Sequence, residues 1–105
     1  TAAQKENFKK RVLEWADRLE APVTSITVRP MKTKWASYST TGRLTFDALL
    51  PECHTDLQDY VIVHELLHFR TPNHGKLWKS LMRAYLGNYE TQELKLRSVT
   101  QGKAL

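Results

Sequence analysis

The segment His64-Glu65-Leu66-Leu67-His68 constrains the fold more than any other stretch of the chain. Two histidines four residues apart lie on one face of a helix, one turn above the other, so their imidazoles can converge on one metal ion. Glu65 follows the first histidine and can hold a water molecule without binding the metal itself. This H-E-x-x-H arrangement predicts a helix that carries two zinc ligands and a general base.

A catalytic zinc site takes three protein ligands and leaves one position for water, so the chain must supply a third ligand. His74 is the candidate. A continuous helix would carry His74 off the ligand face, but Pro72 predicts that the helix ends first, since the residue before a proline is pushed out of the α region. The alternative, a buried helix with two satisfied core histidines, is disfavoured because unpaired buried imidazoles are costly. The predicted zinc ligands are His64, His68 and His74, with Glu65 as the catalytic residue.

Length and composition bound the remaining possibilities. A chain of 105 residues predicts one domain, residues 1–105, and its hydrophobic content of 41% is typical of a globular protein. We expect no membrane partner and no signal peptide, because no apolar run approaches the length of a membrane span and the N-terminus is charged. Cys53 is the single cysteine, which favours a reducing compartment and predicts a cytoplasmic location.

The net charge of +5 is concentrated on both sides of the motif. Residues 21–46 and 66–89 each contain four basic side chains and no acidic one. These side chains are Arg29, Lys32, Lys34, Arg43, Arg70, Lys76, Lys79 and Arg83. A positive field there favours acidic or nucleic-acid partners, although a solvated basic surface is the simpler explanation.

Hydrophobic spacing predicts a helix and three strands in the first half of the chain. Apolar residues at helical spacing indicate an amphipathic helix over residues 1–20. Alternating β-branched residues predict a strand at 25–29, which Pro30 ends. Residues 31–39, around Trp35 and Tyr38, predict a second strand, and the turn at Thr41-Gly42 predicts a hairpin into a third strand at 43–46.

The second half predicts three helices. A capping box from Thr55 to Gln58 opens the motif helix, 57 to about 71, which is apolar nearly all round and therefore central. A further helix is expected at about 73–86, ended by Gly87, and a last one at 91–99 that packs through Leu94, with a frayed tail from Thr100. The predicted fold is α+β: a short, mostly antiparallel three-stranded sheet packed on the N-terminal helix and the motif helix, with two C-terminal helices.

Several segments together resemble the YgjP-like zinc metallopeptidase family and, more distantly, the SprT and Spartan proteases, which act on proteins crosslinked to DNA. The matching segments are 29–39, 42–44, 59–68, 73–74 and 77–78. The resemblance implies a small zincin-like domain with a cleft between the sheet and the active-site helix. It also implies that His64, His68 and His74 bind zinc and that Glu65 is catalytic.

Two features limit what the resemblance and the spacing imply. Ala36 and Tyr38 stand where the family usually has glycine and cysteine, so no role of that cysteine is carried over. The spacing of the four motif residues also equals that of the metzincins. That class requires a glycine where this chain has Thr71, and Met82 lies inside a helical pattern that places it in the core.

The predicted function is a zinc-dependent endopeptidase that hydrolyses peptide bonds of a peptide or protein substrate with a zinc-bound water activated by Glu65. The oxyanion of such a reaction needs a second donor, for which Tyr38, Tyr89 and Arg70 are candidates. The strand at 31–39 is expected to form an exposed sheet edge that can hold an extended peptide.

Two other functions remain as alternatives. The basic segments motivate a zinc-bearing nucleic-acid-associated module, or a protease of DNA-linked proteins, with latent or lost peptidase activity. A purely structural zinc site needs four ligands, usually including cysteine. His54 could complete such a site only if the loop before the motif helix folds back.

Overall fold

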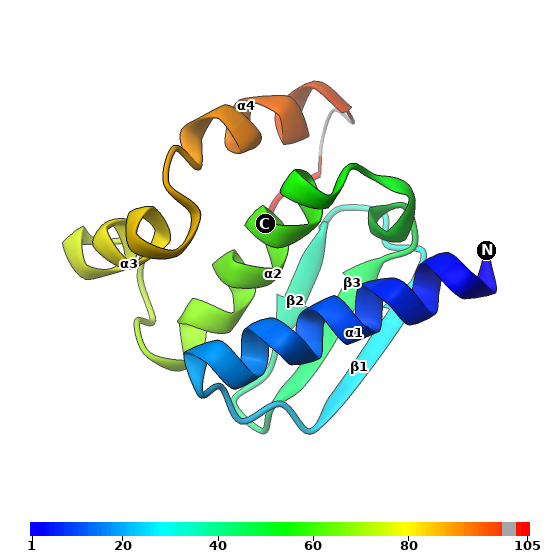
Figure 1. Cartoon of the computed structure of the whole chain (residues 1–105), viewed down its shortest axis with the longest axis horizontal. Helices are drawn as coiled ribbons and strands as arrows, with labels where there is room; N and C mark the ends of the chain where they lie inside the picture. The colour runs from blue at the N-terminus through cyan, green and yellow to red at the C-terminus, as the bar shows by residue number, and fades with distance from the viewer. Residues whose placement is uncertain (100–102) are drawn as a thin grey trace.

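The computed structural model describes residues 1–99 and 103–105, and Figure 1 shows their arrangement. The described residues form four α-helices, three strands and two short 3-10 turns. In chain order these are α1 (Ala2–Leu19), β1 (Ser25–Arg29), β2 (Ala36–Tyr38), β3 (Arg43–Asp47), η1 (Leu50–Glu52), α2 (Thr55–Leu66), η2 (Leu67–Phe69), α3 (Lys76–Leu86) and α4 (Glu90–Val99). The α+β class and the order of helices and strands predicted from the sequence are confirmed.

The sheet is mixed, with the strand order β1-β3-β2. β2 and β3 form the predicted antiparallel hairpin, in which Ala36 pairs with Phe46. β1 lies parallel to β3, in register from Ser25 with Arg43 to Arg29 with Asp47. The expectation of a mostly antiparallel sheet is therefore corrected. Pro30 ends β1, the chain crosses to the far edge to form β2, and β3 returns to the middle of the sheet, which makes β3 parallel to β1.

One hydrophobic core joins α1, α2 and the sheet. α1 crosses the sheet in Figure 1, and the rings of Phe8 and Phe46 meet edge to face with centroids 5.0 Å apart. α2 lies beside α1, and α4 covers α2 from the other side in the same view. Trp35 and Met82 are buried, as expected of core residues. α2 is therefore the central helix that the sequence predicts.

The start of α2 differs from the prediction. Thr55 was expected to cap the helix together with Gln58, but the N-cap is His54, whose Nδ1 accepts a hydrogen bond from the backbone N–H of Asp56 at 3.2 Å. The amide of Gln58 is buried and donates to the carbonyl oxygens of Pro51 and Cys53. The capping box is wrong because the Gln58 amide is engaged by carbonyl oxygens of the η1 turn and of the residue after it.

The end of α2 is an earlier and sharper break than the sequence indicates. The α-helix ends at Leu66 and continues as the 3-10 turn η2 before Pro72. α3 begins at Lys76 and not at Asn73, since the Asn73 side-chain oxygen accepts from the backbone N–H of Gly75 at 3.0 Å. This local turn replaces a first helical turn and leaves His74 in a loop between the two helices.

The C-terminal part of the chain confirms one prediction and corrects two. Gly87 ends α3 with a φ of 67°, as expected of a C-terminal glycine. α4 packs through Leu96, which is buried, whereas Leu94 is 67% exposed. Residues 103–105 are not frayed: Ala104 forms a parallel bridge with Lys34, beside β2. The expectation of fraying at residues 100–102 lies outside the described residues.

None of the helices formed by residues 1–99 combines the length and the apolar character that crossing a membrane requires.

Candidate metal centre and cleft

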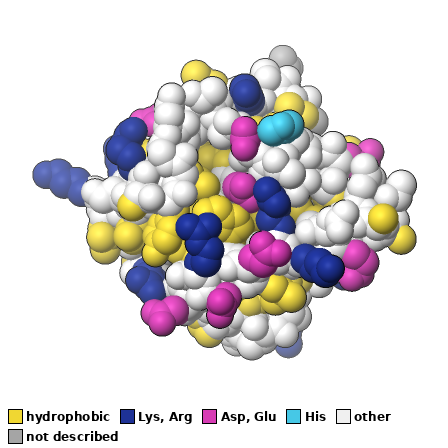
Figure 2. Space-filling view, in the orientation of Figure 1, with side chains coloured by type: hydrophobic (Ala, Val, Ile, Leu, Met, Phe, Trp, Pro, Cys, Tyr) yellow, Lys and Arg dark blue, Asp and Glu magenta, His cyan; other side chains and the backbone are white. Residues whose placement is uncertain are grey.

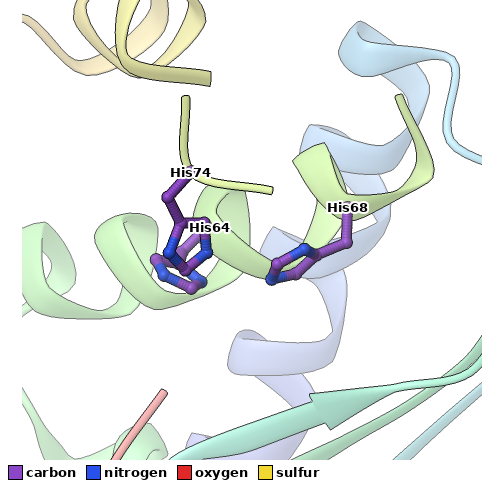
Figure 3. Close-up of side chains that lie close together, drawn as sticks. All are labelled: His64, His68 and His74. Atoms are coloured by element: carbon purple, nitrogen blue, oxygen red, sulfur yellow. The ribbon is translucent and has the colours of Figure 1, made fainter. Parts of the chain in front are cut away.

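Three histidines converge at the point where α2 ends. Their candidate ligand nitrogens all lie within 4.8 Å of one another. Figure 3 shows His64 on α2, His68 on the following turn and His74 on the loop, with the three imidazoles pointing toward one another. The early break of α2 and the turn at Asn73 bring His74 back over the helix. The arrangement can hold one metal ion through three imidazole nitrogens.

The environment of His64 favours a ligand. This residue is 3% exposed, and its Nδ1 has no hydrogen-bond partner among the described residues. Burial, with smaller contributions from the charges of His74 and His68, lowers the pKa of His64 to about 3, so the imidazole is neutral. Glu65 Oε1 lies 3.8 Å from Nδ1, too far for a hydrogen bond. A buried orphan nitrogen is costly, and a bound metal ion would satisfy it.

Aromatic side chains hold the three imidazoles in place. Trp78, on α3, packs against His74 with ring centroids 4.5 Å apart and against His64 at 5.1 Å. Tyr38, on β2, stacks flat on His68, with centroids 5.1 Å apart and an interplanar angle of 5°. Its hydroxyl also lies 3.4 Å from the His68 carbonyl oxygen, a long hydrogen bond. These contacts limit the directions in which the imidazoles can point.

The sequence did not predict that Trp78 and Tyr38 lie beside the histidines. Trp78 follows His74 by four residues, a spacing that brings side chains together on a helix. His74, however, lies before α3, so the contact between the two rings does not come from helical spacing. For Tyr38, the sequence predicted a place on the edge strand and a candidate role as oxyanion donor, but not the stacking on His68.

Glu65 is a buried carboxyl next to the histidine cluster, with 3% of its surface exposed. Burial raises its pKa to about 7, and the positive charge of Lys34 acts in the opposite direction. A carboxyl group with a pKa near neutrality can both accept and return a proton at physiological pH. The sequence predicts the position of Glu65, whereas its burial and the nearby Lys34 emerge from the fold.

A cavity of about 510 Å³ opens beside His64 and His74. Its walls come from α2, α3, α4, the residue before β2 and the 103–105 segment. The lining residues are Trp35, Tyr60, His64, His74, Trp78, Lys79, Tyr89, Glu93, Leu96, Arg97, Lys103, Ala104 and Leu105. The cavity is therefore largely aromatic, with charged side chains of both signs.

The other candidates from the sequence lie in different places. Tyr89 lines the cavity, but Arg70 turns away and donates to the carbonyl oxygen of Leu19 at 2.9 Å. His54 caps α2 with an exposed side chain and does not belong to the histidine cluster. Among the described residues, no fourth histidine, cysteine or carboxylate joins the cluster as a closed structural site would require.

Comparison with known proteins defines the class of this domain. The family model described as the YgjP-like metallopeptidase domain matches residues 1–99. The chain belongs to this family, and it therefore carries a metallopeptidase domain, a class whose substrates are peptides or proteins.

Individual relatives support the same assignment. An uncharacterized protein of Methanocaldococcus jannaschii is 34% identical over 79 residues, which cover 71% of this chain and 72% of the relative. The crystal structure of the metallopeptidase zymogen jannalysin, from the same organism, is similar with a TM-score of 0.73 and 32% identity, over 88% of this chain and 93% of that one.

A second solved structure supports the fold. The metallopeptidase zymogen abylysin of Pyrococcus abyssi has a TM-score of 0.78 and 22% identity, over 93% of this chain and 99% of that one. The small α+β architecture seen in Figure 1 is thus that of known metallopeptidases.

Proposed function

We propose that this protein is a zinc-dependent endopeptidase in which His64, His68 and His74 bind the metal and Glu65 is the catalytic base. One observation carries the proposal: the ligand nitrogens of three imidazoles lie within 4.8 Å of one another, beside a buried carboxyl group and an aromatic cavity. Three nitrogen ligands, with no fourth protein ligand in the cluster among the described residues, form the donor set of a catalytic zinc site and not of a structural one.

The chain's own residues divide the chemistry between them. When bound, zinc acts as a Lewis acid that makes water more acidic and polarises a carbonyl group. The Glu65 carboxylate accepts the proton of the attacking water and delivers it to the nitrogen of the leaving amine. The pKa of about 7 suits both steps, and Lys34 favours the charged form that must act first. Trp78 and Tyr38 keep the ligand imidazoles in position.

Of the three candidate donors to the developing oxyanion, two make other contacts. The guanidinium of Arg70 is engaged with α1, and the hydroxyl of Tyr38 faces the His68 carbonyl oxygen. Tyr89 is buried and lines the cavity. Burial is also the largest cause that raises the pKa of Tyr89, so its hydroxyl stays protonated and able to donate. We assign the oxyanion donor to Tyr89.

From the position of the 103–105 segment we infer a latent form. Trp35 N–H donates to the carbonyl oxygen of Ala104 at 2.8 Å, and Ala104 N–H donates to that of Thr33 at 2.9 Å. The segment thus occupies backbone groups that an incoming peptide would pair with at this end of the β2 edge. The structure of jannalysin is described as that of a zymogen. In this form of the protein, substrate therefore competes with residues 103–105.

A pair of glutamate variants tests the proposal. Glu65→Gln keeps the shape of the side chain and removes the base, so turnover of casein by the zinc-loaded protein should fall by roughly two to four orders of magnitude. Zinc content, measured by elemental analysis, should stay at the parent value. Glu14→Gln changes an exposed glutamate on α1 and should leave turnover unaltered.

Two outcomes would count against the mechanism. Loss of zinc in Glu65→Gln would make Glu65 a ligand or a support for one. Absence of turnover in the parent, with the 103–105 segment displaced and one equivalent of zinc bound, would favour a module that has lost peptidase activity.

A further inference from the structure

Residues 103–105 show how an extended chain sits on the cleft side of the sheet. Lys34 and Ala104 form a parallel bridge, and the backbone bonds on either side of it join the segment to Thr33 and Trp35. Figure 1 shows this end of the chain next to α2, with which Leu105 shares the wall of the cavity. The segment is bridged through one residue, Ala104, to the edge that continues into β2. Its three side chains therefore sample the positions open to any extended peptide at this edge.

The first of these positions is a pocket for a cation. Lys103 Nζ lies 3.0 Å from Oδ1 of Asp47, and both side chains are largely buried, at 12% and 3% exposed. The ammonium group also lies 4.8 Å from the ring centroid of Trp35. A buried carboxylate below an aromatic face binds ammonium and guanidinium groups well.

Asp47 is held in place without Lys103. Its Oδ1 accepts from the backbone N–H of Met31 at 2.8 Å, and its Oδ2 from that of Leu49 at 3.0 Å. Burial acts to raise the pKa of Asp47, but these two donors and Lys103 outweigh it, and the pKa is lowered overall. Because the backbone N–H groups of Met31, after β1, and Leu49, after β3, hold both carboxylate oxygens, the carboxylate stays oriented when the lysine leaves.

The third position of the segment meets the apolar part of the cavity. Leu105 is partly buried against the core and lines the same cavity as His64 and His74. Trp35 lines it as well, so the cation pocket and the apolar wall are continuous with the histidine cluster. The middle residue, Ala104, is exposed, so we expect no preference for a particular side chain at this position of a bound peptide.

We propose that the Asp47–Trp35 pocket is a specificity site for substrate peptides that carry a lysine or arginine two residues before a large apolar residue. The proposal deepens the proposed peptidase function and rests on it. Such a peptide would displace residues 103–105, place its cation against Asp47, and pass its backbone along Thr33 and Trp35. The chain's own Lys-Ala-Leu sequence is the template for this pattern.

Peptide binding tests the pocket separately from catalysis. The full chain is used with Glu65→Gln, so that the probe is not cleaved, and Lys103→Ala, so that its own segment lacks the cation. Zinc-loaded protein is titrated against three fluorescein-labelled peptides, Gly-Lys-Ala-Leu-Gly and its versions with norleucine or glutamate in place of lysine. Norleucine keeps the apolar stem of lysine and removes the charge.

The lysine peptide should bind about tenfold or more tightly than the norleucine peptide, and the glutamate peptide most weakly, because only the ammonium group pairs with the buried carboxylate. Adding Asp47→Asn should abolish the difference between lysine and norleucine, whereas Glu52→Gln, an exposed carboxylate on η1, should preserve it.

Equal affinity for the lysine and norleucine peptides would overturn the proposal, and this comparison needs no change at Asp47. Failure of all three peptides to bind would overturn it as well. A lysine preference that survives Asp47→Asn in a folded protein would assign the cation to another group. None of these results bears on casein turnover by the parent chain, which tests the peptidase function by itself.

Discussion

One side of α2 packs against α1 and the sheet through apolar side chains, whereas the other side carries His64, which lines the cavity, and Glu65, which lies beside His64. Both sides are equally buried: Val63 and Leu66 are 0% and 1% exposed, and His64 and Glu65 are each 3% exposed. On the core side, burial removes apolar surface from water and stabilises the fold. On the cleft side, the same burial leaves an orphan nitrogen and a carboxyl group with a raised pKa.

Within this single helix, the core side contributes to stability and the cleft side carries the groups proposed for the chemistry. The core side is complete in itself, because its side chains find their partners within the chain. The cleft side depends on a ligand for its polar groups, and its geometry comes from the break after Leu66 and the turn at Asn73. Substitutions on the two sides should therefore change different measured quantities.

The largest expected effect is on the core side. Phe46→Ala removes a fully buried ring that packs on Phe8 and should lower the free energy of unfolding by about 3–5 kcal/mol. Zinc bound per folded molecule should not change. Urea denaturation and elemental analysis of the folded fraction measure the two quantities. Loss of zinc in molecules that remain folded would show that the two sides of α2 are coupled.

The matching change on the cleft side is His74→Ala. His74 is exposed and comes from a loop, so the metal-free protein should lose less than about 1 kcal/mol of stability. Zinc affinity should fall at least about tenfold, because a ligand is lost, and with it the stabilisation that zinc provides. Competition with a chromophoric chelator measures the affinity.

A second histidine provides the control for that experiment. His54→Ala removes the N-cap of α2 and should cost about 1 kcal/mol of stability while leaving zinc affinity at the parent value. Unchanged zinc affinity in His74→Ala, or a loss as large in His54→Ala, would remove His74 from the proposed ligand set.

A smaller effect is expected where the chain covers its own cleft. Lys103→Ala removes the partner of Asp47 and should raise peptidase turnover about threefold to tenfold, because the segment competes less well with substrate. Lys95→Ala, on the exposed side of α4, is the matched control and should leave turnover as it is. A fall in turnover for Lys103→Ala would mean that the segment supports the site and does not block it.

The same contact predicts a dependence on pH. Since the pKa of Asp47 is lowered in the folded protein, its stabilising contribution is complete above the ordinary value of 3.8 and is lost as the pH falls through the folded value. The urea midpoint of the parent should therefore decline in acid more steeply than that of Asp47→Asn. Parallel declines would show that Asp47 has the same pKa in both states.

The smallest effect concerns the basic surface. Lys32 and Lys34 are exposed, and replacing both by glutamate should weaken any binding to duplex DNA about twofold to fivefold at low salt, with the difference fading above ~0.15 M. Figure 2 shows lysine, arginine, aspartate and glutamate interspersed on the face that it presents, which favours a modest effect. Salt-independent binding, or none in the parent, would make these lysines ordinary surface.

The sequence predicted the features that depend on local patterns. Helical spacing placed α1, and Pro72 with the H-E-x-x-H motif predicted the break that returns His74 to the helix. Features that depend on distant neighbours were missed. Gln58 donates to the carbonyl oxygens of Pro51 and Cys53 and does not cap α2. The face of α4 that is buried depends on its packing against α2 and not on the composition of α4 alone. Ala104 pairs with Lys34, some seventy positions earlier in the chain.

The central claim is that three histidines at the end of α2 bind one zinc ion beside a free Glu65. Anomalous scattering at the zinc edge, from crystals of the protein purified without chelator, tests it most directly. One peak is expected, with His64, His68 and His74 as its protein ligands and the Glu65 carboxylate outside the ligand set. No peak in zinc-supplemented crystals, or a peak bound by Glu65 in place of His74, would contradict the account.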